Sequence, residues 1–110
     1  GTIERYAFAF TNNLESIEIP ASLQKLGTFA FYKSGIQSLT FEEKSSLTEI
    51  PQSAFAGTNI TAVEIPDSVV RIGSLAFAKC YALEQVTLGR GVREIDFSPF
   101  SFCEKIRYNK

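Results

Sequence analysis

Apolar residues recur along this chain at intervals of 22 to 24 residues, and this period predicts the architecture. One series is the phenylalanine of a repeated Ala-Phe pair, in which Pro99 replaces alanine in the last copy: Phe8, Phe31, Phe55, Phe77 and Phe100. The aliphatic residue that opens each unit keeps the same interval: Leu14, Ile36, Ile60, Leu83 and Ile106. A fixed period of this length indicates a stack of similar units, each forming one turn, or rung, of a solenoid.

Each unit is predicted to contain a short β-strand followed by a bend. Two apolar positions are separated by one polar residue, which is the period of a strand. The expected strands cover residues 17–19, 39–41, 63–65 and 86–88. A second apolar pair follows at a spacing of three: Leu23/Leu26, Leu47/Ile50, Val69/Ile72 and Val92/Ile95. Glycine comes next in two units (Gly27 and Gly73), as expected for a bend with positive φ.

Apolar residues at equivalent positions are expected to form columns along the axis of the stack. A single rung cannot cover its own apolar side, so each rung depends on its neighbours. Burial of one Leu, Ile or Phe side chain stabilises the fold by roughly 1.5–3 kcal/mol. We therefore expect the five phenylalanines of the Ala-Phe series to stand above one another in the core.

One unit is longer than the others between its two apolar pairs. Six residues separate Phe41 from Leu47, whereas the other units use four. The segment Glu42–Ser46 is therefore interpreted as a surface insertion of two residues, in a position that a solenoid tolerates.

The chain is expected to form one solenoid domain, 1–110, of about five repeats. The predicted divisions are 1–13 (partial), 14–35, 36–59, 60–82, 83–105 and 106–110 (partial). Because the chain starts at Gly1 inside a repeat, we expect a fragment of a longer, processed protein.

The amino-acid composition argues against several classes of protein, namely nucleic-acid binders, membrane-spanning proteins and enzymes. The formal net charge is −1, whereas a nucleic-acid binder normally has a basic surplus. No apolar run approaches the ~20 residues that a membrane helix needs. Histidine is absent and no glycine-rich phosphate loop is present, so we expect no enzyme, no catalytic residue and no cofactor. Two cysteines without histidine are too few for a structural zinc site, so no metal is expected either.

The two cysteines, Cys80 and Cys103, occupy equivalent positions three residues after the ladder phenylalanine. Other units carry Thr11, Ser34 and Thr58 there. Small residues at one register favour reduced thiols packed in a tight inner slot. A disulfide between adjacent rungs is the alternative.

Polar residues alternate with the apolar strand positions and should form the outer face of the sheet. This face has four carboxylates and neither lysine nor arginine. It would accept a basic or polar protein, although Glu and Thr are also ordinary solvent-facing strand residues. The candidate partner-binding residues are Glu15, Glu18, Gln37, Thr40, Thr61, Glu64, Glu84 and Thr87.

A second candidate surface consists of aromatic residues outside the ladder. These residues form either an adhesive patch, a second packing layer, or ends that further rungs would cover. They are Tyr6, Phe10, Phe29, Tyr32, Tyr81, Phe97, Phe102 and Tyr108.

Two stretches, 14–31 and 60–80, carry the pattern Leu/Ile-x-x-Ile/Val-x-Ile-Pro-x-Ser-Leu/Val-x-x-Leu/Ile-Gly-x-x-Ala-Phe. This pattern resembles the BspA-like class of leucine-rich repeats. The resemblance implies a right-handed solenoid (a β/α-type superhelix) in which short parallel strands form one sheet and turns with short helical or 3-10 pieces form the other side. It also implies a secreted or cell-surface protein of bacteria or protozoa that takes part in adhesion.

The resulting hypothesis is a non-catalytic cell-surface module that presents the sheet face to a protein of the host matrix or of another cell. The alternatives are a structural spacer without a ligand, and a weak glycan-binding module that uses Tyr32, Tyr81 or Tyr108 as platforms. Unpaired strand edges at both ends also predict end-to-end self-association.

Overall fold

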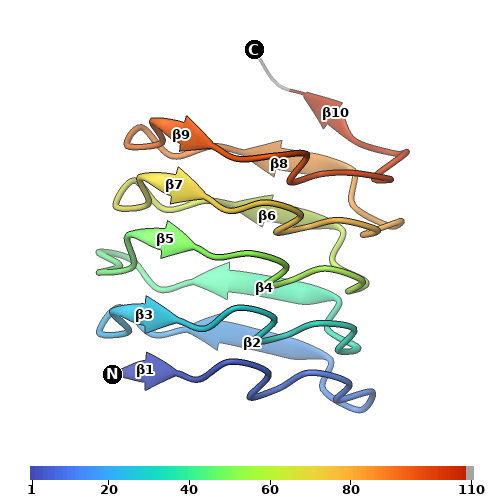
Figure 1. Cartoon of the computed structure of the whole chain (residues 1–110), viewed down its shortest axis with the longest axis horizontal. Helices are drawn as coiled ribbons and strands as arrows, with labels where there is room; N and C mark the ends of the chain where they lie inside the picture. The colour runs from blue at the N-terminus through green and yellow to red at the C-terminus, as the bar shows by residue number, and fades with distance from the viewer. Residues whose placement is uncertain (109–110) are drawn as a thin grey trace.

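The computed structural model describes the backbone of residues 1–108 and the side chains of residues 1–106. The chain winds into a coil in which two stacks of short strands form opposite sides (Figure 1). The even stack contains β2 (Ser16–Ile19), β4 (Ser38–Phe41), β6 (Ala62–Glu64), β8 (Gln85–Thr87) and β10 (Arg107–Tyr108). The odd stack contains β1 (Thr2–Ile3), β3 (Lys25–Leu26), β5 (Glu49–Ile50), β7 (Arg71–Ile72) and β9 (Glu94–Ile95).

Strand pairing follows the sequence period. Every recorded pairing is parallel and joins residues at equivalent positions of neighbouring rungs, such as Ile17 with Leu39 and Val63 with Val86. The parallel solenoid is therefore confirmed, and a strand of the even stack is found at each expected place, but β6 and β8 lie one residue earlier than expected, so that Ile65 and Leu88 fall outside them. The division into repeats that was made from the sequence stays a prediction.

The expectation of a single sheet backed by helical pieces is wrong. A second stack of two-residue strands takes that side, and residues 1–108 contain no helix. The reason lies in the backbone hydrogen bonds, many of which join neighbouring rungs where a helix would bond within one segment. The Gly27 N–H donates to the Ile3 carbonyl at 2.7 Å, and the Phe31 N–H donates to the Ala54 carbonyl at 2.8 Å.

The predicted phenylalanine column is confirmed. Successive ring centroids in the series Phe8, Phe31, Phe55, Phe77 and Phe100 lie 5.1, 5.2, 5.3 and 5.5 Å apart, with interplanar angles of 7° to 11°. The three inner rings are fully buried, whereas Phe8 at the end of the column is 37% exposed. Each of the three inner rings is thus sealed from water by the rungs on both sides of it.

The Ala-Phe turn has an unusual backbone that repeats in every rung. Residues two before and two after the ladder phenylalanine have positive φ, a region that non-glycine residues rarely occupy. In the first rung they are Tyr6 (60°) and Phe10 (62°), and in the last they are Ser98 (44°) and Phe102 (64°). In the first four rungs the N–H groups of these residues bond to carbonyls of the next rung, as Tyr6 does to Thr28 at 3.2 Å.

Gly27 and Gly73 do not serve the purpose expected from the sequence. Neither has positive φ; among the glycines of the described chain only Gly57 does. A Cβ at Gly27 would overlap the backbone nitrogen of Arg5, and one at Gly73 would lie 2.7 Å from the backbone nitrogen of Gln52. These glycines therefore allow neighbouring rungs to approach closely.

Candidate protein-binding surface

The outer side of the even stack, called the even face, is a polar surface. All eight candidate residues named from the sequence are exposed, and the strand pairing places Glu18 beside Thr40 and Glu64 beside Thr87. Acceptor carboxylates therefore alternate with hydroxyls along one row. Such a row can accept and donate hydrogen bonds over several rungs.

The even face and the odd face differ in electrostatics. Of the strands β2, β4, β6 and β8, β2 and β6 carry one glutamate each (Glu18 and Glu64), Glu15 and Glu84 directly precede β2 and β8, and none of the four strands carries a basic residue. On the odd face the equivalent position alternates in sign along the stack, through Lys25, Glu49, Arg71 and Glu94. Neighbouring charges on the odd face therefore compensate one another, whereas the even strands present a single sign to a partner.

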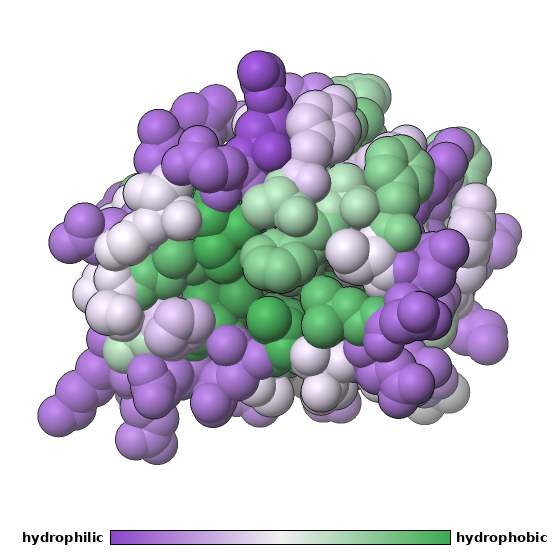
Figure 2. All heavy atoms as spheres, turned by 90° about the horizontal axis from the view of Figure 1, so that it is seen from below, coloured by the Kyte–Doolittle hydropathy of each residue, from purple (hydrophilic) through white to green (hydrophobic). Residues whose placement is uncertain are grey.

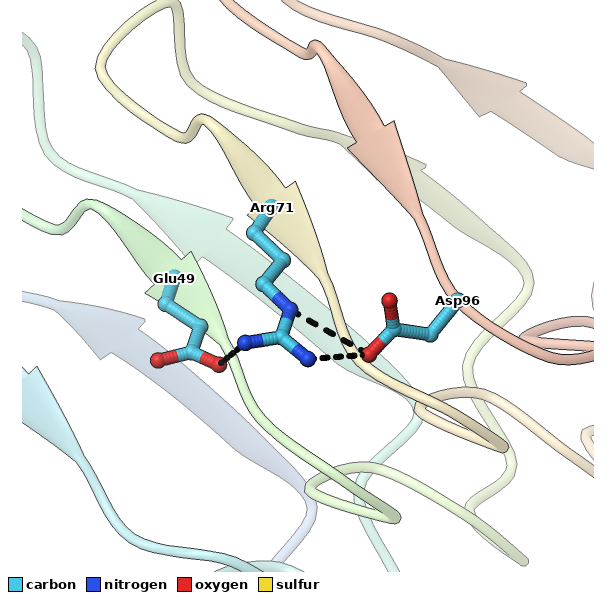
Figure 3. Close-up of polar contacts among 3 residues, drawn as sticks. All are labelled: Glu49, Arg71 and Asp96. Atoms are coloured by element: carbon cyan, nitrogen blue, oxygen red, sulfur yellow. Dashed lines mark hydrogen bonds and ion pairs between the residues drawn. The ribbon is translucent and has the colours of Figure 1, made fainter.

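The charges at the centre of the odd face are paired (Figure 3). Arg71 donates from Nη2 and Nε to Asp96 Oδ2 at 2.7 and 3.2 Å, and its Nη1 lies 3.7 Å from Glu49 Oε2. The hydrogen bond to Asp96 is the main cause that raises the pKa of Arg71 above its usual value. The arginine joins three rungs, but its exposure makes each ion pair weak.

A groove of about 850 Å³ crosses the even face between β4 and β6. The two strands lie next to each other but belong to separate ladders, β2 with β4 and β6 with β8 and β10. The groove is lined by both strands, by the insertion 42–45 and by the loop 66–68. It contains four candidate residues, namely Gln37, Thr40, Thr61 and Glu64.

Both loops at the groove are held by defined hydrogen bonds. Glu42 Oε1 accepts the Ala21 N–H at 2.7 Å, and Asp67 Oδ1 accepts the Arg90 N–H at 2.9 Å. Ser68 Oγ donates to the Leu47 carbonyl at 2.6 Å. The walls are thus built into the coil, which lowers the entropy that binding a partner would cost.

Sequence analysis did not single out the loop 66–68 or the charge alternation on the odd face. The two-residue insertion after Phe41 is the feature of the sequence from which the groove could have been predicted. It was predicted to lie on the surface, but not to line a groove. The charge alternation could have been predicted from the residue that precedes the second member of each apolar pair spaced by three, for example Lys25 before Leu26 and Glu49 before Ile50. On the even stack, the backbone of Arg107 pairs in register with Gln85, and the side chain of Arg107 lies outside the described part.

The aromatic residues outside the ladder do not form one surface. Tyr6 stacks on Phe29 at 4.9 Å, and Tyr32 makes edge contacts with Phe29 and Phe10 at 5.2 and 5.6 Å. These four rings form one cluster near the β1 end, in which Tyr6 and Phe10 are 49% and 59% exposed. Tyr81 is exposed in a later rung, Phe97 and Phe102 are exposed near the β9 end, and the side chain of Tyr108 lies outside the described part.

Both cysteines are free thiols that face the interior slot. Cys80 Sγ lies 3.2 Å from the Phe55 carbonyl, and Cys103 Sγ lies 3.0 Å from the Phe77 carbonyl. The pKa of Cys103 is raised. The main cause is its hydrogen bond with the neighbouring Cys80 thiol, and the second cause is burial. A raised pKa disfavours the thiolate, so Cys103 is a poor nucleophile in this setting.

No cluster of three or more metal-ligating side chains occurs among the described residues. Within residues 1–108, no helix has the length and apolar character that a membrane span requires.

A family model described as BspA type leucine rich repeat region matches residues 1–110 in six copies. The chain is similar to a leucine rich cell surface protein from Faecalibacterium prausnitzii A2-165, with 33% identity and a TM-score of 0.88 over 99% of this chain and 30% of that one. It is also similar in fold to the pneumococcal vaccine antigen PcpA, with 20% identity and a TM-score of 0.79 over 92% of this chain and 33% of that one. The chain thus spans about a third of the length of these structures. No curated protein matches it.

Proposed function

Because the chain belongs to the BspA-type leucine-rich repeat family, we propose that it is a non-catalytic protein-binding module of a bacterial cell-surface protein, used in adhesion. One of the similar structures is a cell-surface protein by its own description, which supports this location. The even face is the proposed binding surface, and the groove between β4 and β6 is its centre.

The observation that carries the proposal is the contrast in charge between the two faces. On the odd face, Arg71 lies between two carboxylates, so that its charge is already compensated. On the even face, no described hydrogen bond or salt bridge involves the carboxylates of Glu18, Glu64 or Glu84. Unpaired charges of one sign attract a partner of the opposite sign, here a protein segment rich in Lys or Arg.

A peptide display library with random sequences tests the proposal directly. We expect binders to the native chain to be enriched in Lys and Arg, and their affinity to fall as salt is added. The variant Glu18→Lys/Glu64→Lys/Glu84→Lys should lose these binders. A selection that yields no basic enrichment would contradict the proposal.

A matched control separates position from net charge. The variant Glu4→Lys/Glu94→Lys/Glu104→Lys alters three exposed glutamates outside the even face and changes the net charge by the same amount. It should keep the binders that the even-face variant loses. Equal loss in both variants would mean that overall charge, and not the even face, directs binding. Circular dichroism of each variant verifies that the fold is intact.

The two alternatives lead to different outcomes. A spacer without a ligand would give no reproducible binders on either face. A glycan-binding module would bind sugars through exposed tyrosines, but the edge contacts of Tyr32 with Phe10 and Phe29 already occupy part of its surroundings. Tyr81→Ala tests the remaining exposed ring on a glycan array.

A further inference from the structure

Viewed along the axis of the coil, apolar side chains gather at the centre and polar side chains form most of the rim (Figure 2). The groove between β4 and β6 departs from this arrangement. Phe41 occupies the position at which Ile19 and Ile65 are buried in the neighbouring rungs, but it remains partly exposed and lines the groove. Ala62 and Pro66 are further apolar lining residues that reach solvent. The groove thus combines apolar surface with the charges of the even face.

Two features of the sequence account for the groove at this place. The two additional residues after Phe41 build a wall that the other rungs lack. Pro66 has no N–H, so it cannot donate to the Phe41 carbonyl as Glu42 donates to the Ile19 carbonyl at 2.9 Å. β4 and β6 lie next to each other without a hydrogen-bonded ladder, in agreement with this missing donor. Both features lie in central rungs, with a complete rung on either side.

Carboxylates stand on both sides of the groove. Glu64 on β6 and Glu43 in the insertion are exposed, and neither takes part in a described hydrogen bond or salt bridge. Glu42 and Asp67 add negative charge, although each also accepts a backbone N–H. Lys44 is the only basic residue among the described residues that line the groove. A cation in the groove would therefore meet negative charge on both walls, beside apolar surface.

Among cationic side chains, arginine matches these features better than lysine does. Its guanidinium is planar, stacks on aromatic rings and donates five N–H groups in a fixed fork that pairs with carboxylates, whereas the lysine ammonium is a strongly hydrated point charge. The apolar stem of the side chain covers apolar surface while the charged head reaches the carboxylates. A groove of about 850 Å³ is larger than one side chain, so it has room for several residues of an extended segment.

We propose that the groove between β4 and β6 selects arginine over lysine in an extended peptide segment of the partner. The guanidinium packs on Phe41 and pairs with Glu64 and Glu43. The insertion is then the element that determines specificity, and the rest of the even face supplies long-range attraction. This inference rests on the proposed function and adds to it the residue type that is recognised and the place of recognition.

Two peptides of equal length and charge test the inference, one alternating arginine with serine and the other alternating lysine with serine. Isothermal titration calorimetry on the native chain should give about fivefold tighter binding for the arginine peptide. Added salt should weaken both, because charge attracts both. Equal affinity for the two peptides would overturn the inference and leave the proposed function intact, whereas a lack of binding by either peptide would overturn both.

Two variants locate the preference in the groove. Phe41→Leu removes the ring but keeps an apolar side chain, and Leu88 is the natural residue at the equivalent position of a later rung. Deletion of Glu43 and Lys44 restores the four-residue spacing of the other units without changing the net charge. Each variant should bind both peptides in a salt-dependent way, but with little preference between them. An arginine preference that survives both changes would refute the role of the groove.

A matched pair of charge variants gives a test that leaves the apolar residues untouched. Glu64→Gln and Glu84→Gln each remove one carboxylate from the even face, but only Glu64 lines the groove. Glu64→Gln should weaken binding of the arginine peptide more than that of the lysine peptide, whereas Glu84→Gln should weaken both by the same factor. Circular dichroism verifies the fold of every variant, and this pair decides the question if Phe41→Leu unfolds. Identical effects of the two substitutions would contradict the assignment of Glu64.

Discussion

At the scale of single residues, the position three residues after each ladder phenylalanine carries a hydroxyl in three rungs. Two of these hydroxyls form a hydrogen bond and one does not. Thr11 Oγ1 donates to the Phe8 carbonyl at 2.6 Å, and Thr58 Oγ1 donates to the Phe55 carbonyl at 2.9 Å. Ser34 occupies the same register, but its buried hydroxyl has no hydrogen-bond partner. A buried unpaired polar group opposes folding.

Replacing Ser34 and Thr58 by alanine should therefore change the free energy of unfolding in opposite directions. Ser34→Ala is expected to raise the free energy of unfolding by up to about 1 kcal/mol, because it removes an unpaired buried hydroxyl. Thr58→Ala should lower it by about 1–2 kcal/mol, because a hydrogen bond and a buried methyl group are lost. Urea unfolding measures both. A loss of stability in Ser34→Ala would show that its hydroxyl has a partner in solution.

The phenylalanine column allows a comparison between the centre and the end of the coil. Phe55→Ala should cost about 3–5 kcal/mol, because it leaves a cavity between two rungs. Phe8→Ala should cost clearly less, because Phe8 is 37% exposed and has a ring on one side only. Urea unfolding at low protein concentration measures both values. Equal costs would show that the end of the column is as well packed as its centre.

At the scale of elements, the chain builds its strands from very short segments that are stable only in pairs with other rungs. The four sequence-predicted strands were found because polar and apolar residues alternate in them, as in Ile17–Ile19. The odd strands were not predicted, since β3 and its equivalents are two residues long and offer no alternation. Their apolar pairs, such as Leu23 and Leu26, have a spacing of three that is equally compatible with a helical turn.

The role of the glycines also could not be inferred from one rung. Gly27 looks like a bend residue in sequence, but its lack of a side chain matters because Glu4 and Arg5 of the preceding rung lie against it. Contact between rungs depends on the stacking distance, which the order of residues within a unit does not reveal. The exposure of Glu18 and Glu64, in contrast, could be predicted, because both lie within strands and alternation places them opposite the buried residues.

Glycine substitutions test this explanation. Gly73→Ala should lower the free energy of unfolding by about 1–3 kcal/mol, because the new Cβ meets backbone atoms that cannot move independently. Gly57→Ala should cost less despite its φ of 73°, because its Cβ meets mainly the flexible side chain of Lys33, and Lys33 itself adopts positive φ at the equivalent position. Thermal or urea unfolding ranks the two variants. A larger loss at Gly57 would mean that φ, and not the approach of the rungs, limits these positions.

At the scale of the whole molecule, stability is expected to vary along the axis. In a solenoid each rung contacts only its neighbours, so interior rungs have two interfaces and terminal rungs have one. The exposed fractions follow this rule: Phe55 and Ile72 are fully buried, whereas Phe8 and Ile95, at the equivalent positions of the outer rungs, are 37% and 51% exposed.

Amide hydrogen exchange measures this gradient. The N–H groups of the central rungs, such as that of Phe55 bonded to the Ala76 carbonyl at 2.8 Å, should exchange most slowly. Those of Tyr6 and Lys79, in the outer rungs, should exchange faster although their bonds are of similar kind. The experiment is done at low protein concentration, so that only contacts within one chain protect the amides. Uniform protection over the chain would indicate that all rungs open together.

The loop 42–46 after β4 shows how proteins of this kind can change their binding surface without changing their fold. Two additional residues there leave the inward side chains on both flanks in place, with Leu39 and Leu47 still buried. The bonds from Ala21 to Glu42 and from Ser46 to Ala21 fasten both ends of the loop to the preceding rung. Foreign peptide spliced between Glu43 and Lys44 would thus be displayed at the rim of the groove, so recognition can be rewritten at this corner while the scaffold stays the same.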